Sequence, residues 1–219
     1  MRTKVNKWNI LFMLLGNLVL GLGVAVFKLS GLGNDPYTGM VMALGERVHM
    51  EYANLLVILN IVLFLVQITF GRKYIGFGTF FNAILQGYVV TFFYYLVCKL
   101  GAPEVMWQKL VTVVIGLLVG GIGLAMYQNA KAGAAPYDSL SMILCDRSHK
   151  SYFGCRMLTD LICAVICFAS GGIVNVGTVA SVLLMGPVAD VINRKFVSKI
   201  IKDATEVPAR QSEVEEVLR

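Results

Sequence analysis

The segment Gly33-Asn34-Asp35-Pro36-Tyr37 recurs one hundred residues later in the chain as Gly133-Ala134-Ala135-Pro136-Tyr137. The same spacing relates other residues, several of them glycines: Gly16 and Gly116, Gly21 and Gly121, Gly23 and Gly123, His49 and His149, Asn60 and Asp160. With a spacing one residue shorter, Gly78-Thr79 corresponds to Gly177-Thr178. Recurrence at one regular spacing indicates that the chain contains two copies of the same structural unit.

The composition predicts that both units lie in a membrane. Hydrophobic residues make up 57% of the 219 positions and charged residues only 15%, whereas soluble domains carry about 25% charged residues. Apolar stretches lie near residues 8–28, 52–70, 74–97, 108–129, 155–170 and 173–192. Because a helix needs about 20 apolar residues to cross a bilayer core, we expect six transmembrane helices. The stretch 155–170 is the weakest, but its counterpart at 52–70 is clear.

The charges of the connecting segments predict the orientation of these helices. Basic residues occupy the segment 2–7, the turn Arg72-Lys73 and the connection 130–156, which has four positive and two negative side chains. The connection 29–51 has one positive and three negative side chains. Since cytoplasmic connections are enriched in Lys and Arg, both termini are expected in the cytoplasm. Each unit has three spans, an odd number, so the two units must cross the membrane in opposite directions.

The predicted fold is an all-α integral membrane protein with six transmembrane helices in two inverted three-helix repeats, about 8–97 and 108–193. Each repeat carries an additional short helix. Residues 1–195 are expected to form a single membrane domain, and residues 196–219 a cytoplasmic tail.

The two recurring Pro-Tyr segments mark the start of the short helices. Glycines before Pro36 interrupt the first span, and proline is favoured at the first position of a new helix. Asp35 is a good N-cap, whereas the second copy has Ala135 there. The helices are expected to end by Gly45–Arg47 and near Asp146, at roughly 16 Å or half a bilayer core. Each helix is therefore either re-entrant or interfacial, and the recurrence of the motif favours the re-entrant form.

The first turns of these short helices are the predicted binding site. Unsatisfied amide hydrogens and the helix dipole make such ends partly positive, and two of them can face one cavity. Acidic side chains beside both ends favour a cation or a zwitterion over an anion as the solute. The candidate substrate-binding residues are Asp35, Pro36, Tyr37, Asn60, Pro136, Tyr137, Asp138 and Asp160.

Polar residues within the expected spans have a functional and a structural interpretation. Asp160 is the carboxylate that lies well inside a span, where it either carries a proton or makes a hydrogen bond to a neighbouring helix. Asn82 and Gln86 share one helix face and either line a polar path or bond across helices. Asp190 precedes Arg194 by four residues, which favours an ion pair along the helix.

Several functional classes find no support in the sequence. The net charge of +6 flanks apolar stretches, so no nucleic-acid surface is expected. The sequence shows no metal-ligand cluster, no Ser/His/Asp set and no Gly-rich phosphate loop, so we expect no cofactor, no metal and no enzymatic activity. Gly116 and Gly120 favour helix packing within the subunit, with a homodimer as the alternative.

The order and spacing of the Gly-x-x-Pro-Tyr segments at 33–37 and 133–137, with Gly78-Thr79 and Gly177-Thr178, resemble those of the YczE/YyaS/YitT-like family of bacterial integral membrane proteins. The resemblance covers most of residues 8–195. It implies a bacterial protein of the plasma membrane. In related sequences an acid often follows the aromatic residue after the proline; Asp138 matches this pattern and Thr38 departs from it.

The function expected from these features is a secondary transporter or permease, which moves a small molecule or ion across the lipid bilayer. The alternative is an accessory or regulatory membrane protein without transport activity of its own. The two differ at mid-membrane. A transporter needs a polar cavity walled by both short helices and by Asn60 and Asp160, whereas an accessory protein is packed solid there.

Overall fold

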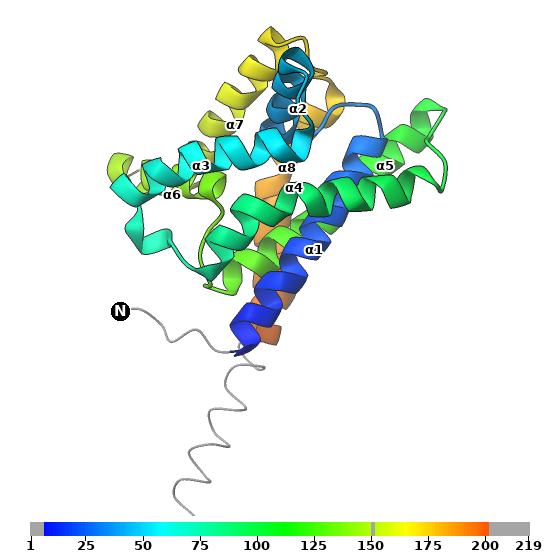
Figure 1. The fold of residues 1–219 in the computed structure, drawn as a ribbon. Helices are drawn as coiled ribbons and strands as arrows, with labels where there is room; N and C mark the ends of the chain where they lie inside the picture. Colours follow the sequence, from blue (N-terminus) through cyan, green and yellow to red (C-terminus); the bar gives the residue numbers. More distant parts are fainter. Residues whose placement is uncertain (1–6, 150–151, 202–219) are drawn as a thin grey trace, which may run out of the picture.

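The computed structural model describes residues 7–149 and 152–201, and the regular secondary structure of this part of the chain is all helical (Figure 1). The helices are α1 (Lys7–Leu29), α2 (Pro36–Val48), α3 (Tyr52–Phe70), α4 (Phe77–Cys98), α5 (Met106–Asn129), α6 (Pro136–Ser148), α7 (Tyr152–Ala169) and α8 (Val176–Ile192). A 3₁₀ turn, η1 (Arg72–Tyr74), precedes α4, and a π-helical turn, η2 (Asn193–Val197), extends α8. The short helices begin at Pro36 and Pro136 as predicted, and they end slightly later than expected.

Five helical segments are long and apolar enough to cross a membrane: α1, α3, α4, α5 and the continuous segment Val176–Ile201. Helix α7, whose 18 residues include Arg156 and Asp160, is not among these five. Large apolar side chains are exposed along these helices, for example Leu65, Phe92 and Val114. An apolar exterior of this kind is stable against lipid and not against water. The chain is therefore an α-helical, multi-pass membrane protein.

Glycines bring α1 and α5 into close backbone contact. A Cβ atom on Gly23 would lie 2.3 Å from the Gly120 backbone nitrogen, and one on Gly16 would lie 2.5 Å from the Tyr127 nitrogen. Residue numbers rise along α1 while those of its contacts fall along α5, so the two helices are antiparallel (Figure 1). Gly120 thus packs against a helix of its own subunit, as the sequence favoured.

The contacts between α1 and α5 come in pairs that are related by the repeat spacing of one hundred residues. Gly16 lies against Tyr127, and its counterpart Gly116 lies against Phe27, the counterpart of Tyr127. The two contacts therefore have the same form, with the first helices of the two copies in exchanged roles.

The loop before each short helix is bound by the other copy. The Gly78 amide donates to the Ala132 carbonyl at 2.8 Å, and the Gly177 amide donates to the Leu32 carbonyl at 3.0 Å. These two glycines belong to the recurring Gly-Thr pairs at the start of α4 and α8. A side chain at either position would meet the loop, since a Cβ on Gly177 would lie 2.6 Å from the Leu32 oxygen. The Gly-Thr pairs thus hold the two copies together.

Each short helix also packs on a long helix of the other copy. Helix α2 packs mainly on α7, and α6 packs on both α3 and α7, so these four helices form one group (Figure 1). Helices α1, α4, α5 and α8 form the other, with α1 and α5 at its centre. This packing brings the first turns of α2 and α6 together between the groups.

The first and last residues that the structure describes, Lys7 and Ile201, lie at the same end of the helix bundle (Figure 1). Phe12 near the start of α1 packs against Val197 and Ile201, which follow α8. The first six residues of the predicted cytoplasmic tail, 196–201, thus continue the last helix and bury two side chains. The remainder of the predicted tail, 202–219, and the basic segment before Lys7 lie outside the described residues.

Candidate functional site

The first turns of α2 and α6 are built as the sequence predicted, with one difference in capping. Asp35 Oδ2 accepts a hydrogen bond from the Thr38 amide at 3.0 Å and so caps α2. Ala135 has no side chain for this role, and only its carbonyl accepts from the Ser139 amide, at 2.9 Å. Proline occupies the first helical position in both copies. Both first turns are buried in the protein.

Two tyrosines join the copies at this point. The rings of Tyr37 and Tyr137 stack, with centroids 4.2 Å apart and planes inclined by 5°. The Tyr37 hydroxyl donates to Asn60 Oδ1 at 2.8 Å, and the Tyr137 hydroxyl donates to Asp160 Oδ1 at 2.5 Å. Four of the candidate site residues therefore form one repeated arrangement, in which each short helix is tied to the long helix that follows it in its own copy.

The second copy adds an ion-pair cluster that the first copy lacks. Arg156 pairs with Asp138 on α6 and, at 3.4 Å, with Asp160 one turn further along α7. Its guanidinium also lies over the Tyr137 ring, 5.2 Å from the centroid. The residue at the corresponding position in the first copy is Leu56.

Arg156 corrects one sequence-based interpretation. Its charge was assigned to the connection 130–156, but the residue lies within α7 and its side chain is only 18% exposed. Two acids in a poorly solvated region require a cation beside them, and Arg156 meets this requirement. A signal for this was available, since Asp160 follows Arg156 by four residues on one helix face.

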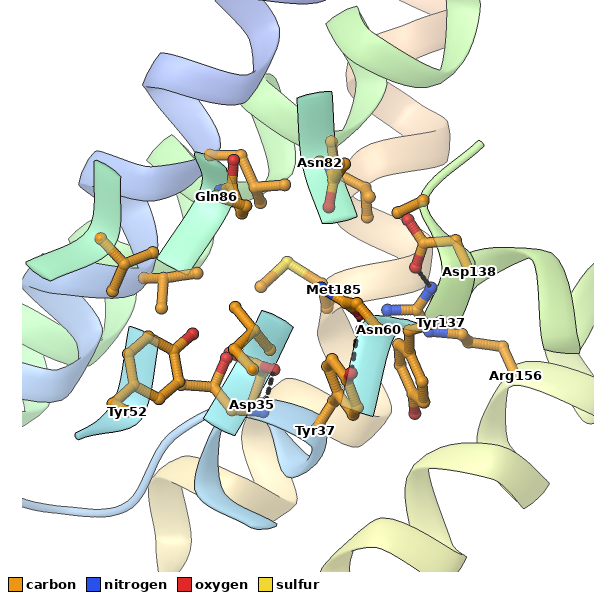
Figure 2. Close-up of a pocket in the computed structure, with 17 residues that line it drawn as sticks. Asp35, Tyr37, Tyr52, Asn60, Asn82, Gln86, Tyr137, Asp138, Arg156 and Met185 are labelled. Carbon is orange, nitrogen blue, oxygen red and sulfur yellow. Dashed lines mark hydrogen bonds and ion pairs between the residues drawn. The ribbon is translucent and has the colours of Figure 1, made fainter. Parts of the chain in front are cut away.

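A cavity of about 90 Å³ lies beside the stacked tyrosines (Figure 2). Both copies line it, and its polar wall includes Asp35, Tyr52, Asn60, Gln86, Asp138 and Arg156. Leu56, Val90 and Met185 supply apolar wall. Tyr52, the first residue of α3, thus faces the cavity.

Some polar atoms of the cavity have no hydrogen-bond partner among the described residues. These are Asp35 Oδ1 and both amide atoms of Gln86, a side chain that is 8% exposed. Asn82, one turn before Gln86, instead donates to Asn17 Oδ1 on α1 at 2.5 Å. Asn82 therefore makes a bond between helices, one of the two roles expected from the sequence, while Gln86 faces the cavity and has no partner among the described residues. Asn17 was not identified from the sequence, because it lies alone in an apolar stretch.

A second cavity, of about 490 Å³, lies on the other side of Arg156. It extends between α5, α7 and α8 past Asp160 to the Asp190–Arg194 ion pair, whose closest atoms are 2.9 Å apart. This pair confirms the contact predicted from its spacing. Arg156, Leu124 and Met185 border both cavities. These three side chains, which we call the partition, therefore separate the smaller cavity from the larger one.

The side chains at this site offer hydrogen bonds and charge. Within the described residues, no three His, Cys, Asp or Glu side chains gather closely enough to hold a metal ion. His49 and His149 instead end the two short helices in the left-handed conformation, with φ of 53° and 55°.

The fold and the site define a class: an α-helical integral membrane protein with a central cavity that is lined by polar and apolar side chains from both recurring segments of the chain. Within that class, the chain belongs to the family of unknown function DUF6198, whose model matches residues 7–194.

The chain is similar to three curated relatives. It is 25% identical to the uncharacterized protein YyaS of Bacillus subtilis over 84% of this chain and 94% of the relative. It is 28% identical to an uncharacterized protein of Haemophilus influenzae, over 78% and 76%. It is 23% identical to the uncharacterized membrane protein YczE of B. subtilis, over 83% of each. No solved structure matches the chain. The predicted resemblance to the YczE/YyaS-like family is confirmed.

Proposed function

We propose that this protein is a secondary transporter that moves a small solute across the bacterial plasma membrane by alternating access. The observation that carries the proposal is the buried polar cavity where the first turns of α2 and α6 meet, lined by both copies and separated by a partition from a larger cavity. Sites of this kind, formed by interrupted helices between repeats, are typical of secondary transporters. An accessory protein has no need of an unpaired polar cavity in its core.

The transport proposal includes two inverted repeats of three spans. The antiparallel packing of α1 on α5 supports inversion, because these are the homologous first helices of the two copies. Helix α7 is the proposed sixth span. Of its charged side chains, Asp160 is buried and Arg156 is only 18% exposed, while Leu161, Val165 and Phe168 are 57%, 60% and 75% exposed. An even number of spans agrees with both described ends lying together.

The short helices are proposed to be re-entrant. Their first turns are buried at the stacked tyrosines, whereas their last turns, Glu46–Val48 and Asp146–Ser148, are exposed. A helix that lies along the membrane surface would expose one face along its whole length. Each short helix therefore leads from one surface of the protein to its centre, and the two enter from opposite sides in an inverted arrangement.

The partition is the proposed gate on one side. The larger cavity leads from Arg156 to Arg194, at the end of the bundle where both described ends lie. The positive-inside rule assigns this end to the cytoplasm. In this state the solute reaches the smaller cavity when the Arg156 pairs with Asp138 and Asp160 rearrange. The counterpart of this route in the first copy passes Leu56 and Asn60.

Cysteine accessibility tests alternating access without knowledge of the solute. In a variant without the five native cysteines, Ala189→Cys places a thiol beside the larger cavity and Val90→Cys places one at the corresponding position of the first copy. An impermeant thiol reagent is expected to reach Ala189→Cys from the cytoplasmic face and Val90→Cys from the outer face. Modification of either is expected to slow reaction at the other. Val165→Cys, on the exposed apolar face of α7, is the control. Reaction from one face only, whatever the conditions, contradicts the transporter and supports the accessory protein.

A further inference from the structure

We infer that the smaller cavity binds a small organic ammonium cation between Asp35 and Gln86. The inference rests on the proposed function, to which it adds the chemical class of the solute. Figure 2 shows Asp35 and Gln86 on opposite sides of the space, with the Asp138–Arg156 pair at a third side. Because the cavity is small, one occupant can face both unpaired groups.

The charges around the cavity leave a negative excess. Asp35 and Asp138 line the cavity, and Asp160 contacts its wall through Arg156. Arg156 is the one cation among the described residues that line this cavity, and both of its ion pairs are with the other two acids. Asp35 is left without a cation. An uncompensated charge is costly in a poorly solvated site, and a bound cation removes that cost.

The free atoms match an ammonium group in hydrogen-bonding capacity. Asp35 Oδ2 is occupied by the Thr38 amide, whereas Oδ1 has no partner in the described structure. Gln86 Oε1 is likewise a free, buried acceptor. A primary ammonium has three N–H donors and no acceptor, so it carries enough donors for both oxygens.

The remaining wall argues against an anion and against a metal ion. Asp35 and Asp138 already place a carboxylate at each helix end, so neither end is free to hold a second anion. A hard metal ion takes about six or more oxygen ligands, whereas Asp35 Oδ1 and Gln86 Oε1 are the only buried oxygens without a hydrogen-bond partner among the described side chains that line the cavity. Apolar wall suits a short alkyl group attached to the ammonium. At about 90 Å³, the cavity has roughly the volume of three water molecules.

The test is a thermal-unfolding titration of the purified full chain in detergent with methylammonium chloride, against sodium chloride at equal ionic strength. A ligand that binds the folded state raises Tm in a concentration-dependent, saturable way. We expect this for wild type and for Asp146→Asn, a charge-matched change at an exposed site. We expect a loss of at least tenfold in apparent affinity for Asp35→Asn, in which asparagine still caps α2.

Gln86→Leu, which removes the second oxygen, is expected to weaken the shift as well and serves if Asp35→Asn does not fold. The inference is overturned if methylammonium gives no saturable shift beyond sodium chloride, if neither cavity variant weakens it, or if sodium formate stabilises the protein instead. The cysteine experiment needs no ligand. Alternating labelling without methylammonium binding therefore refutes only the solute class, and binding with one-sided labelling refutes only transport.

Discussion

Tyr37 and Tyr137 stack ring on ring, 4.2 Å apart, and each donates its hydroxyl to the residue 23 positions later in its own copy. The acceptors are Asn60 and Asp160, which the repeat also relates. The centre of the molecule is thus made of one motif used twice. Because one acceptor is neutral and the other is charged, the two halves of this arrangement are expected to respond differently to the same substitution.

Tyr37→Phe and Tyr137→Phe each remove one of these hydroxyls. Each is expected to lower the free energy of unfolding by about 1–3 kcal/mol, because a buried acceptor loses its donor, with the larger loss for Tyr137→Phe beside a carboxylate. Denaturant titration in detergent measures both. The control is Tyr88→Phe, which breaks an exposed 2.9 Å bond to Asn54 and should cost less than about 0.5 kcal/mol. Equal losses at all three positions would contradict the buried hydrogen bonds assigned to Tyr37 and Tyr137.

Arg156→Leu places in the second copy the residue that the first copy has at position 56. It is expected to destabilise the protein by about 3–5 kcal/mol, because Asp138 and Asp160 are left buried without a cation. Adding Asp138→Asn and Asp160→Asn to the same chain should recover most of this loss. Chemical unfolding of the single and triple variants measures the recovery.

Arg194→Leu is the matched control for Arg156→Leu. Arg194 pairs with Asp190 at 2.9 Å, but its side chain is 78% exposed. Exposed ion pairs contribute about 0–1 kcal/mol, so this change should be nearly neutral. A triple variant as unstable as Arg156→Leu would show that the guanidinium acts through packing and not through charge.

Gly23→Ala tests the crossing of α1 and α5. The added Cβ would lie 2.3 Å from a backbone nitrogen of Gly120, and backbone atoms cannot move aside as a side chain can. We expect a loss of about 1–3 kcal/mol from overpacking, or failure to fold. Gly39→Ala is the control, since its Cβ would meet only Cys167 Sγ at 3.4 Å and alanine favours a helix. Comparable yields and melting temperatures for both variants would contradict the glycine contact.

The sequence predicted features that neighbouring residues determine, and it did not predict contacts between helices. Local signals located the breaks before Pro36 and Pro136, because glycine, proline and an N-cap act within a few residues. The spacing of Arg156 and Asp160 was a local signal for one ion pair, but the pair of Arg156 with Asp138 joins two helices and could not be read from the sequence. The Gly-Thr pairs were recognised as recurring, but their role is a contact between copies, which no local pattern reveals. The same applies to the stacked tyrosines.

The proposed topology makes a prediction about two connections. Reporter fusions at Gly101 and Gly172 are both expected to report from outside the cytoplasm, because the basic turn Arg72-Lys73 lies on the other side of α4 from Gly101. The structure places Arg156 within α7 and not in the preceding connection, and this does not change the expectation. When Arg156 and its ion-pair partner Asp138 are both left out of the charges of the connection before α7, this connection keeps three positive side chains against one negative. A cytoplasmic signal from either fusion would contradict the inverted repeat.

Asp160→Asn tests whether the buried acid carries a proton during transport. Asparagine still accepts a hydrogen bond from Tyr137, as Asn60 does from Tyr37, so the tyrosine arrangement should survive. Arg156 keeps its pair with Asp138 and loses one with Asp160.

Uptake of radiolabelled methylammonium into proteoliposomes, measured with and without an imposed pH gradient, is the assay for Asp160→Asn. If Asp160 carries the coupled proton, the gradient no longer drives accumulation in the variant, while exchange of methylammonium at equal pH continues. If gradient-driven accumulation persists, Asp160 positions Tyr137 and Arg156 and carries no proton. Asp190→Asn, which alters an exposed acid of the larger cavity, should leave both measurements within about twofold of wild type.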